Sequence, residues 1–356
     1  MANSLSRERK NKIVGYWLMT GVFMIIIQTL IGGITRLSGS GLSITEWNII
    51  TGTLPPLNHQ QWMEEFAKYQ QTPQFRLLNA DFTLKDFQFI FFWEWFHRIW
   101  ARLLGFAFAI PFIYFWIKKY FTKDMLLPFV GIFILGALQG AIGWIMVASG
   151  LTGDAIYVRP TRLALHFVCA MILGCYVFWF ALKLLKPQYE GLHNRALKNF
   201  LIVILAVLFF QFVYGALMAG FKAAPAAATW PTINGKWIPE GLGEAREGHP
   251  LIDNVITVHF IHRTLAYLIT LLIVIYTIRV SKIKATVNKW KYLPVLFVII
   301  QVLLGILTIS TSVRINANEW GLFETLALLH QMTAMFLMLS LLEQVFYFSK
   351  KKAIHA

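Results

Sequence analysis

The stretch FQFIFFWEWFHRIWARLLGFAFAIPFIYFWI (87–117) decides the fold. Apolar residues flank a polar cluster that holds Glu94, His97, Arg98 and Arg102. About 20 predominantly apolar residues are enough for a helix to cross the hydrocarbon core of a bilayer. Ionisable side chains inside such a span are costly, and by default they mark a functional site. The stretch therefore predicts a transmembrane helix that carries a site.

Seven further windows of the chain share this apolar character. The eight predicted spans are 13–35, 88–117, 125–148, 161–182, 198–220, 252–278, 292–312 and 322–348. The composition agrees with them, because 57% of the residues are hydrophobic, 14% are charged and the mean hydropathy is +0.60. These values lie far from those of a soluble globular domain. We expect an all-α polytopic membrane protein with eight transmembrane helices.

The basic residues are spread unevenly over the predicted loops. Of the 32 lysines and arginines, 19 fall in one alternating set of segments, 10 in the other set and three inside spans. Cytoplasmic loops carry the excess of Lys and Arg, so we expect both termini to be cytoplasmic. The excess of basic residues behind the net charge of +15 is then explained by the orientation of the chain in the membrane. This explanation argues against nucleic-acid binding. The segment MANSLSRERKNK (1–12) shows no signal- or transit-peptide pattern, which favours a bacterial inner membrane.

Three sequence elements recur along the chain. EWFHRIWARLLG (94–105) aligns with HFIHRTLAYLIT (259–270), and RLALH (162–166) aligns with LALLH (326–330). The motif Q-x-x-x-G occurs in four alternate spans, at Gln28–Gly32, Gln139–Gly143, Gln211–Gly215 and Gln301–Gly305. We expect two pseudo-symmetric four-helix bundles, residues 1–190 and 191–356, related as parallel repeats. The motif predicts close helix packing, with Gln bonding across the bundle; a quinone or haem-edge contact is the alternative for Gln.

Two long outer segments interrupt this symmetry. Residues 37–87 contain turn-rich sequence followed by HQQWMEEFAKYQQ (59–71), which predicts a short amphipathic helix at the surface. Residues 221–251 are rich in Pro, Gly and Ala and predict an irregular cap. The two cysteines, Cys169 and Cys175, share one span and offer neither a disulfide nor a metal site.

Four histidines lie at one depth in the even-numbered spans: His97, His166, His262 and His330. Two facing imidazoles in a four-helix bundle can hold haem iron, one from each helix. One pair in each bundle therefore predicts two haem sites. Zinc or copper is an alternative, with His259 as a third donor in the second bundle. A histidine that bonds only to a neighbouring helix is the structural alternative.

Charged side chains surround these histidines. Arg98, Arg102 and Arg263 are candidate partners for haem propionates, and snorkelling to the interface is the alternative. Glu94 precedes His97 by three residues, where the second bundle has His259. A buried carboxylate there could exchange protons or stabilise a cation; pairing with Arg98 or orienting His97 are its structural alternatives. The asymmetry favours a catalytic first bundle and an electron-transferring or structural second bundle.

The sequence resembles the haem A synthase family, in the branch shared by proteobacterial and mitochondrial members (type 2). The resemblance covers nearly the whole chain. It rests on GGITRLSGSGLSITEWNIITGTLPPL (32–57), FIFFWEWFHRIWARLLG (89–105), VHFIHR (258–263), His166 and His330. It implies oxidation of the C8 methyl group of haem O to a formyl group, which gives haem A for cytochrome c oxidase. The implied route passes through hydroxylated intermediates and takes its oxygen from water.

The resemblance also implies where the haems bind. A haem b in the C-terminal half, 191–356, would take His262 and His330 as axial ligands. The substrate haem O in the N-terminal half, 1–190, would take His97 and His166, with Glu94 nearby. Another branch carries a cysteine pair in the first outer loop; residues 37–87 have none, so a thiol role there does not apply.

We expect several partners besides haem O and the lipid bilayer, although the sequence names neither the electron acceptor nor the oligomeric state. They are an electron acceptor, a haem O synthase (a farnesyltransferase) that supplies the substrate, and a second copy of the chain in a homo-oligomer. The competing prediction is a dihaem b-type protein that carries electrons from quinol and leaves both haems unmodified. A transporter is disfavoured, because the spans lack Gly/Pro breaks at the midplane.

Overall fold

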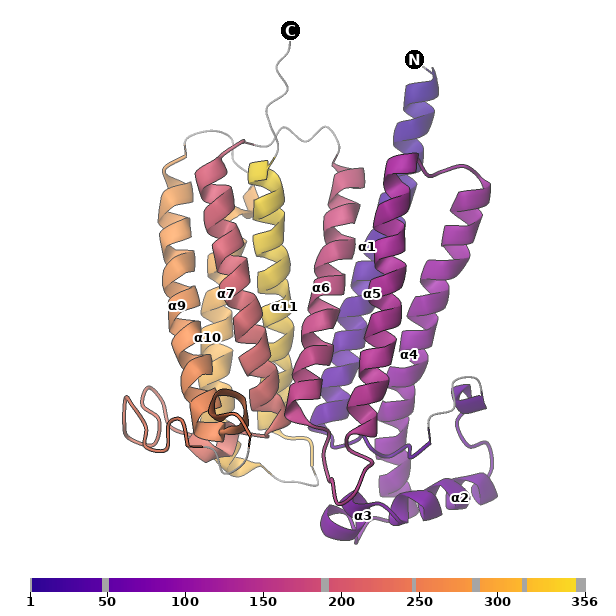
Figure 1. The fold of residues 1–356 in the computed structure, drawn as a ribbon, viewed down its shortest axis with the longest axis vertical. Coiled ribbons are helices and arrows are strands. Elements are labelled where there is room, and N and C mark those ends of the chain that lie inside the picture. Colours follow the sequence, from indigo (N-terminus) through magenta and orange to yellow (C-terminus); the bar gives the residue numbers. More distant parts are fainter. Residues whose placement is uncertain are drawn as a thin grey trace. The chain divides into compact units, whose positions relative to one another are not determined.

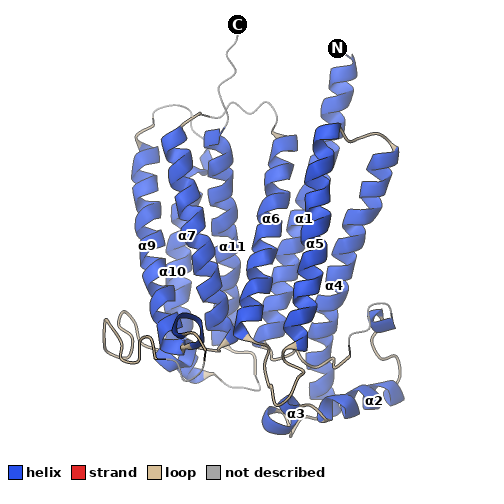
Figure 2. Ribbon diagram, in the orientation of Figure 1, coloured by secondary structure: helices blue, strands red, loops and turns tan. Residues whose placement is uncertain are grey.

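The computed structural model describes residues 2–46, 51–186, 192–244, 248–283, 289–315 and 319–349. Helices dominate this part of the chain, which has no strand apart from one isolated bridge between Ile233 and Lys236 (Figure 2). Eight of its helices are long and apolar enough to cross a membrane, which confirms the predicted polytopic all-α fold. Expectations for 47–50, for the connection at 187–191, and for the basic residues at 284 and 350–352 lie outside the described residues.

Each predicted span corresponds to one long helix to within a few residues, although α1 extends well beyond its predicted start. The helices are α1 (Ala2–Leu37), α4 (Leu84–Ile117), α5 (Lys123–Ala148), α6 (Pro160–Leu185), α7 (Arg195–Gly220), α9 (Val255–Ser281), α10 (Leu293–Thr311) and α11 (Leu322–Ser349). Helix α1 begins before its apolar window because Arg, Lys and Glu are themselves good helix formers. Large apolar side chains such as Phe106, Ile110 and Phe210 are exposed along these helices, as expected of surfaces that face lipid.

Side-chain caps fix where three of the spans begin. Thr83 and Asp86 form a capping box at the start of α4, with Thr83 N donating to Asp86 Oδ2 at 2.9 Å. The side-chain oxygen of Asn194 caps α7 and that of Asn254 caps α9. Such oxygens satisfy backbone N–H groups that the first turn leaves unpaired. The Asn254 cap places the candidate ligand His262 in the second to third turn of α9.

Short helices occupy the segments between the long helices. They are η1 (Thr51–Thr53), α2 (His59–Gln70), α3 (Pro73–Leu78), η2 (Ala224–Ala227), α8 (Pro250–Asp253), η3 (Lys289–Tyr292) and η4 (Ser312–Arg314). Helix α2 confirms the helix predicted at 59–71, and Figure 1 shows it with α3 beside the start of α4. The ring of Phe87 stacks on Phe66 and Tyr69, with centroids 5.1 and 5.3 Å away. This aromatic packing holds α2 on α4.

The described helices group into two units. One is Gly21–Ala170, and the other combines Met1–Thr20 with Met171–Ala356. In the second unit α7 and α10 each contact both α9 and α11, so these four helices close into a bundle (Figure 1). In the first unit α4 packs on α5 through ring contacts such as Phe108 with Phe133. The division at 1–190 and 191–356, the pseudo-symmetry and the cytoplasmic termini stay predictions.

Candidate functional site

Each Q-x-x-x-G motif meets one span histidine on a neighbouring helix. The glutamine amide contacts the imidazole, and the glycine one turn further on lies against the same ring. The matched sets are Gln28, Gly32 and His97; Gln139, Gly143 and His166; Gln211, Gly215 and His262; and Gln301, Gly305 and His330. The structure thus shows the close packing expected of the motif, and it identifies the histidine as the partner.

In unit Gly21–Ala170 the glutamine side chain contacts its histidine at several atoms. Gln28 Nε2 lies 3.2 Å from both ring nitrogens of His97 and donates to its main-chain carbonyl oxygen at 3.2 Å. Gln139 Nε2 lies 3.2 Å from Nδ1 and 3.4 Å from Nε2 of His166, and it donates to that carbonyl oxygen at 3.1 Å. Both imidazoles are therefore hydrogen-bonded in the interior of the unit.

In the other unit the histidine rings have different partners. Gln301 Nε2 lies 3.1 Å from His330 Nε2, and His330 Nδ1 lies 3.1 Å from the main-chain oxygen of Gln301. A carbonyl oxygen can only accept, so Nδ1 carries the proton and Nε2 keeps its lone pair. Gln211 Nε2 is 3.5 Å from His262 Nε2. The arrangement at His330 matches the outer-shell bond that orients metal-ligating histidines.

The four glycines leave space that the imidazoles fill. A Cβ added at Gly143 would stand 2.8 Å from His166 Cε1, and one at Gly32 would stand 2.9 Å from His97 Cε1. The corresponding distances are 3.0 Å at Gly305 and 3.3 Å at Gly215. Ordinary carbon contacts are about 3.5–4.0 Å. A larger residue would push the ring away from its seat, most of all at Gly143.

The pair His262 and His330 fits axial ligation of a haem. The ring centroids of His262 and His330 are 6.4 Å apart with an interplanar angle of 66°. Two imidazoles that each bind one metal at about 2 Å place their centroids roughly 6 Å apart. Within the described residues, no group of three or more His, Cys, Asp or Glu side chains could hold a metal ion. Paired imidazoles in apolar surroundings therefore suit haem better than zinc or copper.

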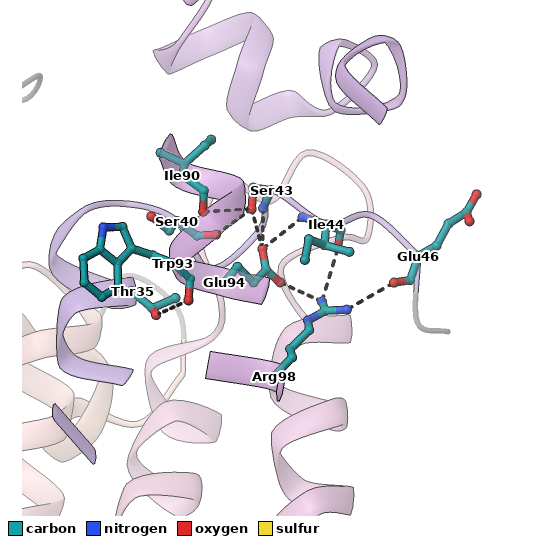
Figure 3. A network of polar contacts seen from close by, with 9 residues as sticks. All are labelled: Thr35, Ser40, Ser43, Ile44, Glu46, Ile90, Trp93, Glu94 and Arg98. Atoms are coloured by element: carbon teal, nitrogen blue, oxygen red, sulfur yellow. Dashed lines mark hydrogen bonds and ion pairs between the residues drawn. The ribbon is translucent and has the colours of Figure 1, made fainter. Parts of the chain in front are cut away.

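Glu94 is buried, and both of its oxygens accept hydrogen bonds. Its Oε2 accepts from Ser43 N at 2.7 Å, from Ser43 Oγ at 2.8 Å and from Ile44 N at 2.9 Å. Its Oε1 accepts from Arg98 Nη2 at 2.6 Å (Figure 3). These donors match an ionised carboxylate, which can only accept. The structure shows the pairing with Arg98 that the sequence offered as an alternative, and a catalytic role for Glu94 stays a prediction.

The arginines that match in the repeat both hold outer loops. Arg98 donates to the main-chain oxygens of Ile44 at 3.3 Å and of Glu46 at 3.2 Å. Arg263 donates to the oxygens of three residues in the second outer loop: Ala227 at 2.5 Å, Thr229 at 2.7 Å and Thr232 at 3.2 Å. Arg102 is half-buried on α4. The role of these arginines as propionate partners stays a prediction.

His259 is fully buried, and it bonds to a loop carbonyl group. Its Nε2 lies 2.7 Å from the main-chain oxygen of Ala223, at the start of the second outer loop. A carbonyl oxygen only accepts, so His259 donates this bond. With Arg263 it holds residues 223–232 against α9. Sequence reasoning did not find these bonds, because loop carbonyl groups leave no signal in the side-chain pattern.

A small cavity adjoins the Glu94–Arg98 pair within unit Gly21–Ala170. Its volume is about 230 Å³. It is lined by Arg98, residues 44–46, Trp144, Val147, Ala148, Leu151 and Thr152. Polar groups and this volume give room for several water molecules beside the guanidinium.

The chain is similar to proteins of known family over most of its length. A family model described as cytochrome oxidase assembly protein (COX15-CtaA) matches residues 15–342. A protein of Flavobacterium psychrophilum named Heme A synthase is 38% identical over 349 residues, which cover 96% of this chain and 100% of that protein. Proteins of Brucella suis and Brucella ovis with the same name are 38% identical over 325 residues, which cover 90% of each chain.

Proposed function

The chain belongs to the COX15-CtaA family of cytochrome oxidase assembly proteins, and we propose from this that it is the membrane oxidoreductase that converts haem O to haem A. The observation that carries the proposal is the similarity to Heme A synthase proteins over at least nine-tenths of this chain. The eight apolar helices make it a multi-pass membrane protein. The uneven distribution of Lys and Arg over its loops supports insertion in a bacterial inner membrane with both termini cytoplasmic.

The reaction replaces the C8 methyl group of haem O by a formyl group. The new oxygen comes from water, and the net change releases four electrons and four protons. A hydroxymethyl group forms first, and its further oxidation gives a gem-diol that loses water. The cavity beside Arg98 supports this assignment, because it can hold water next to the residue that follows His97 in the chain.

We assign the substrate site to His97 and His166. Both belong to unit Gly21–Ala170, and the glycine of a Q-x-x-x-G motif seats each ring. Glu94 lies three residues before His97 and so shares its helix face. Its ion pair and loop bonds fix the carboxylate in place. A fixed negative charge favours positive charge that develops as electrons leave the methyl carbon.

We assign haem b to His262 and His330. The 6.4 Å separation of their ring centroids and the bond from His330 Nδ1 to the main chain support axial ligation by both rings. When bound there, haem b supplies a one-electron carrier. The residues around it hold the second outer loop through His259 and Arg263. A dihaem electron-transfer protein that leaves both haems unmodified is not favoured by the similarity to Heme A synthase proteins.

The test is chemical identification of the haem that the chain produces. The full chain is expressed in a bacterial host that makes haem O and lacks its own haem A synthesis, and membrane haems are extracted and separated by chromatography. We expect haem A, or hydroxylated haem O as an intermediate. The His97→Ala variant should lose the product, and His193→Ala, in the loop before α7, should keep it. Protohaem and unchanged haem O alone would overturn the proposal in favour of electron transfer.

A further inference from the structure

The second outer loop exposes three large apolar side chains within a short stretch. Trp237 and Ile238 are 69% and 73% exposed, and Trp230 is 47% exposed. All three belong to residues 229–238, which we call the tryptophan turn. Single apolar residues on a surface are ordinary, whereas large ones that gather at one place mark a contact surface.

The tryptophan turn has a defined backbone. Ile233 N donates to the main-chain oxygen of Lys236 at 2.9 Å, and Lys236 N donates to that of Ile233 at 3.1 Å. Asn234 and Gly235 between them have φ values of 50° and 85°, as the central residues of a two-residue hairpin turn require. Ile233 is buried. The turn thus packs one apolar side chain inward and leaves its tryptophans exposed.

Arg263 ties this turn to a membrane-spanning helix. It is the ninth residue of α9, and it donates to the main-chain oxygens of Thr229 at 2.7 Å and Thr232 at 3.2 Å. Thr229 Oγ1 donates to the same oxygen of Thr232 at 2.8 Å and accepts from Asn234 N at 2.8 Å. In Figure 1 part of the connection between α7 and α9 extends sideways past α9, level with the turns at which α9 begins. The connection therefore runs beside this end of the helix.

The first turns of α9 lie at the surface of the bilayer. Its 27 residues extend about 40 Å at about 1.5 Å per residue, whereas the hydrocarbon core is about 30 Å thick and the headgroups bring the total to about 40–45 Å. The ends of α9 therefore reach the headgroup regions. Tryptophan is enriched at this depth, because its ring is apolar and its N–H can still bond to water or headgroups.

We propose that the tryptophan turn is an interfacial anchor that inserts Trp230, Trp237 and Ile238 into the lipid surface beside α9. Lipid is the partner because the turn is tied to a helix that the bilayer surrounds, at the depth that suits tryptophan. Lys236 pairs with Glu240, so these two charges offset each other and the contact is mainly apolar. The anchor involves no haem chemistry and so stands apart from the proposed function.

The test compares two cysteine variants of the full chain that differ in the environment we expect. Ile238→Cys places a thiol in the proposed anchor, and Glu240→Cys places one at a side chain that is 84% exposed on the same loop. Both are made with Cys169→Ala and Cys175→Ala, so that each protein has a single thiol. The proteins are placed in phosphatidylcholine nanodiscs that hold one copy each, and reaction with a water-soluble polyethylene glycol maleimide is timed.

We expect the thiol at 238 to react about tenfold more slowly than the thiol at 240, because the reactive thiolate is disfavoured in apolar surroundings. Trp237→Cys should also react slowly, and it provides a second position in the anchor. Equal rates at 238 and 240 would overturn the proposal, since both positions are exposed when no lipid covers them. Slow reaction at 238 in native membranes but not in the nanodiscs would also overturn it, because the cover would then be another protein or a second copy.

A photoactivatable lipid identifies the cover directly. The wild type is placed in nanodiscs that contain phosphatidylcholine with a diazirine near the carboxyl end of one acyl chain, and adducts are located by peptide mass spectrometry after illumination. We expect adducts within 229–238. The peptide that contains Phe210, a side chain 64% exposed on α7, is the positive control for lipid contact. Adducts on that peptide with none in 229–238 would contradict the anchor.

Discussion

Replacing Gly143 by alanine tests the closest of the four contacts between a motif glycine and a histidine ring. The new Cβ would stand 2.8 Å from His166 Cε1, whereas carbon atoms in contact are about 3.5–4.0 Å apart. The imidazole must therefore move by about 0.7 Å or more. Functional groups need to stay within about 0.5 Å of the productive position. The substitution should displace the ring beyond that tolerance while it leaves the rest of α5 unchanged.

Gly143→Ala changes the free energy of unfolding in two opposite ways, by raising helix propensity and by overpacking the contact with His166. The displacement of the imidazole has no such compensation in its effect on haem A formation. Alanine in a helix interior is favoured over glycine by about 1 kcal/mol, and an overpacked site costs about 1–3 kcal/mol. The net change in unfolding free energy should thus stay within about 2 kcal/mol. A ligand misplaced by about 1 Å can cost a factor of about 100 in rate. We expect at least a tenfold loss of haem A formation.

The same helix supplies the control for Gly143→Ala. A Cβ added at Gly136 or Gly140 meets no atom within 4 Å, so alanine there should preserve haem A formation and raise thermal stability slightly. The assay measures extracted haems by chromatography and unfolding by thermal scan for all three variants. Wild-type haem A formation in Gly143→Ala would refute the claim that Gly143 positions the His166 imidazole. An equal loss in all three variants would also refute it, because the loss would then not depend on His166.

Three further predictions concern the polar contacts. Glu94→Gln should destabilise the protein by about 3–5 kcal/mol in thermal unfolding, since it leaves Arg98 largely buried without its counter-charge; Glu8→Gln, in the exposed ion pair with Lys12, should cost under about 1 kcal/mol. Arg263→Ala should expose the second outer loop to limited proteolysis, because its three carbonyl bonds disappear; an unchanged cleavage rate would contradict this. Burial raises the pKa of Tyr69 to about 12, so the folded state holds the phenol proton more tightly than the unfolded state, where the pKa is about 10. This stabilisation is complete below about pH 10 and is lost towards about pH 12, so wild type should lose stability more steeply than Tyr69→Phe across that range.

The fold could be predicted largely from the length of the apolar windows in the sequence. Windows such as 88–117 are long enough to span a bilayer, and each became one helix. The sequence also indicated α2, because Trp62, Phe66 and Tyr69 recur at helical spacing. The start of α1 could not be placed, since its first turns are polar and carry no apolar signal.

The candidate site could be predicted only in part. The matched positions of the histidines in the two repeats pointed to two pairs, and the Q-x-x-x-G motif pointed to close packing. The glycine and the histidine lie on different helices, so no local pattern linked Gly143 to His166. The loop donors to Glu94 were missed for the same reason, because Ser43 and Ile44 use main-chain groups of an irregular loop. Such contacts depend on tertiary structure.

The haem content of the purified ligand variants tests the two-site assignment most directly. Haems are extracted from the wild type and from four single alanine variants, at His97, His166, His262 and His330, all made in a host that supplies haem O. We predict that the first two variants keep protohaem and lose haem O and its products. The last two should lose protohaem. A protein that retains both kinds of haem when all four histidines are replaced together would contradict the account.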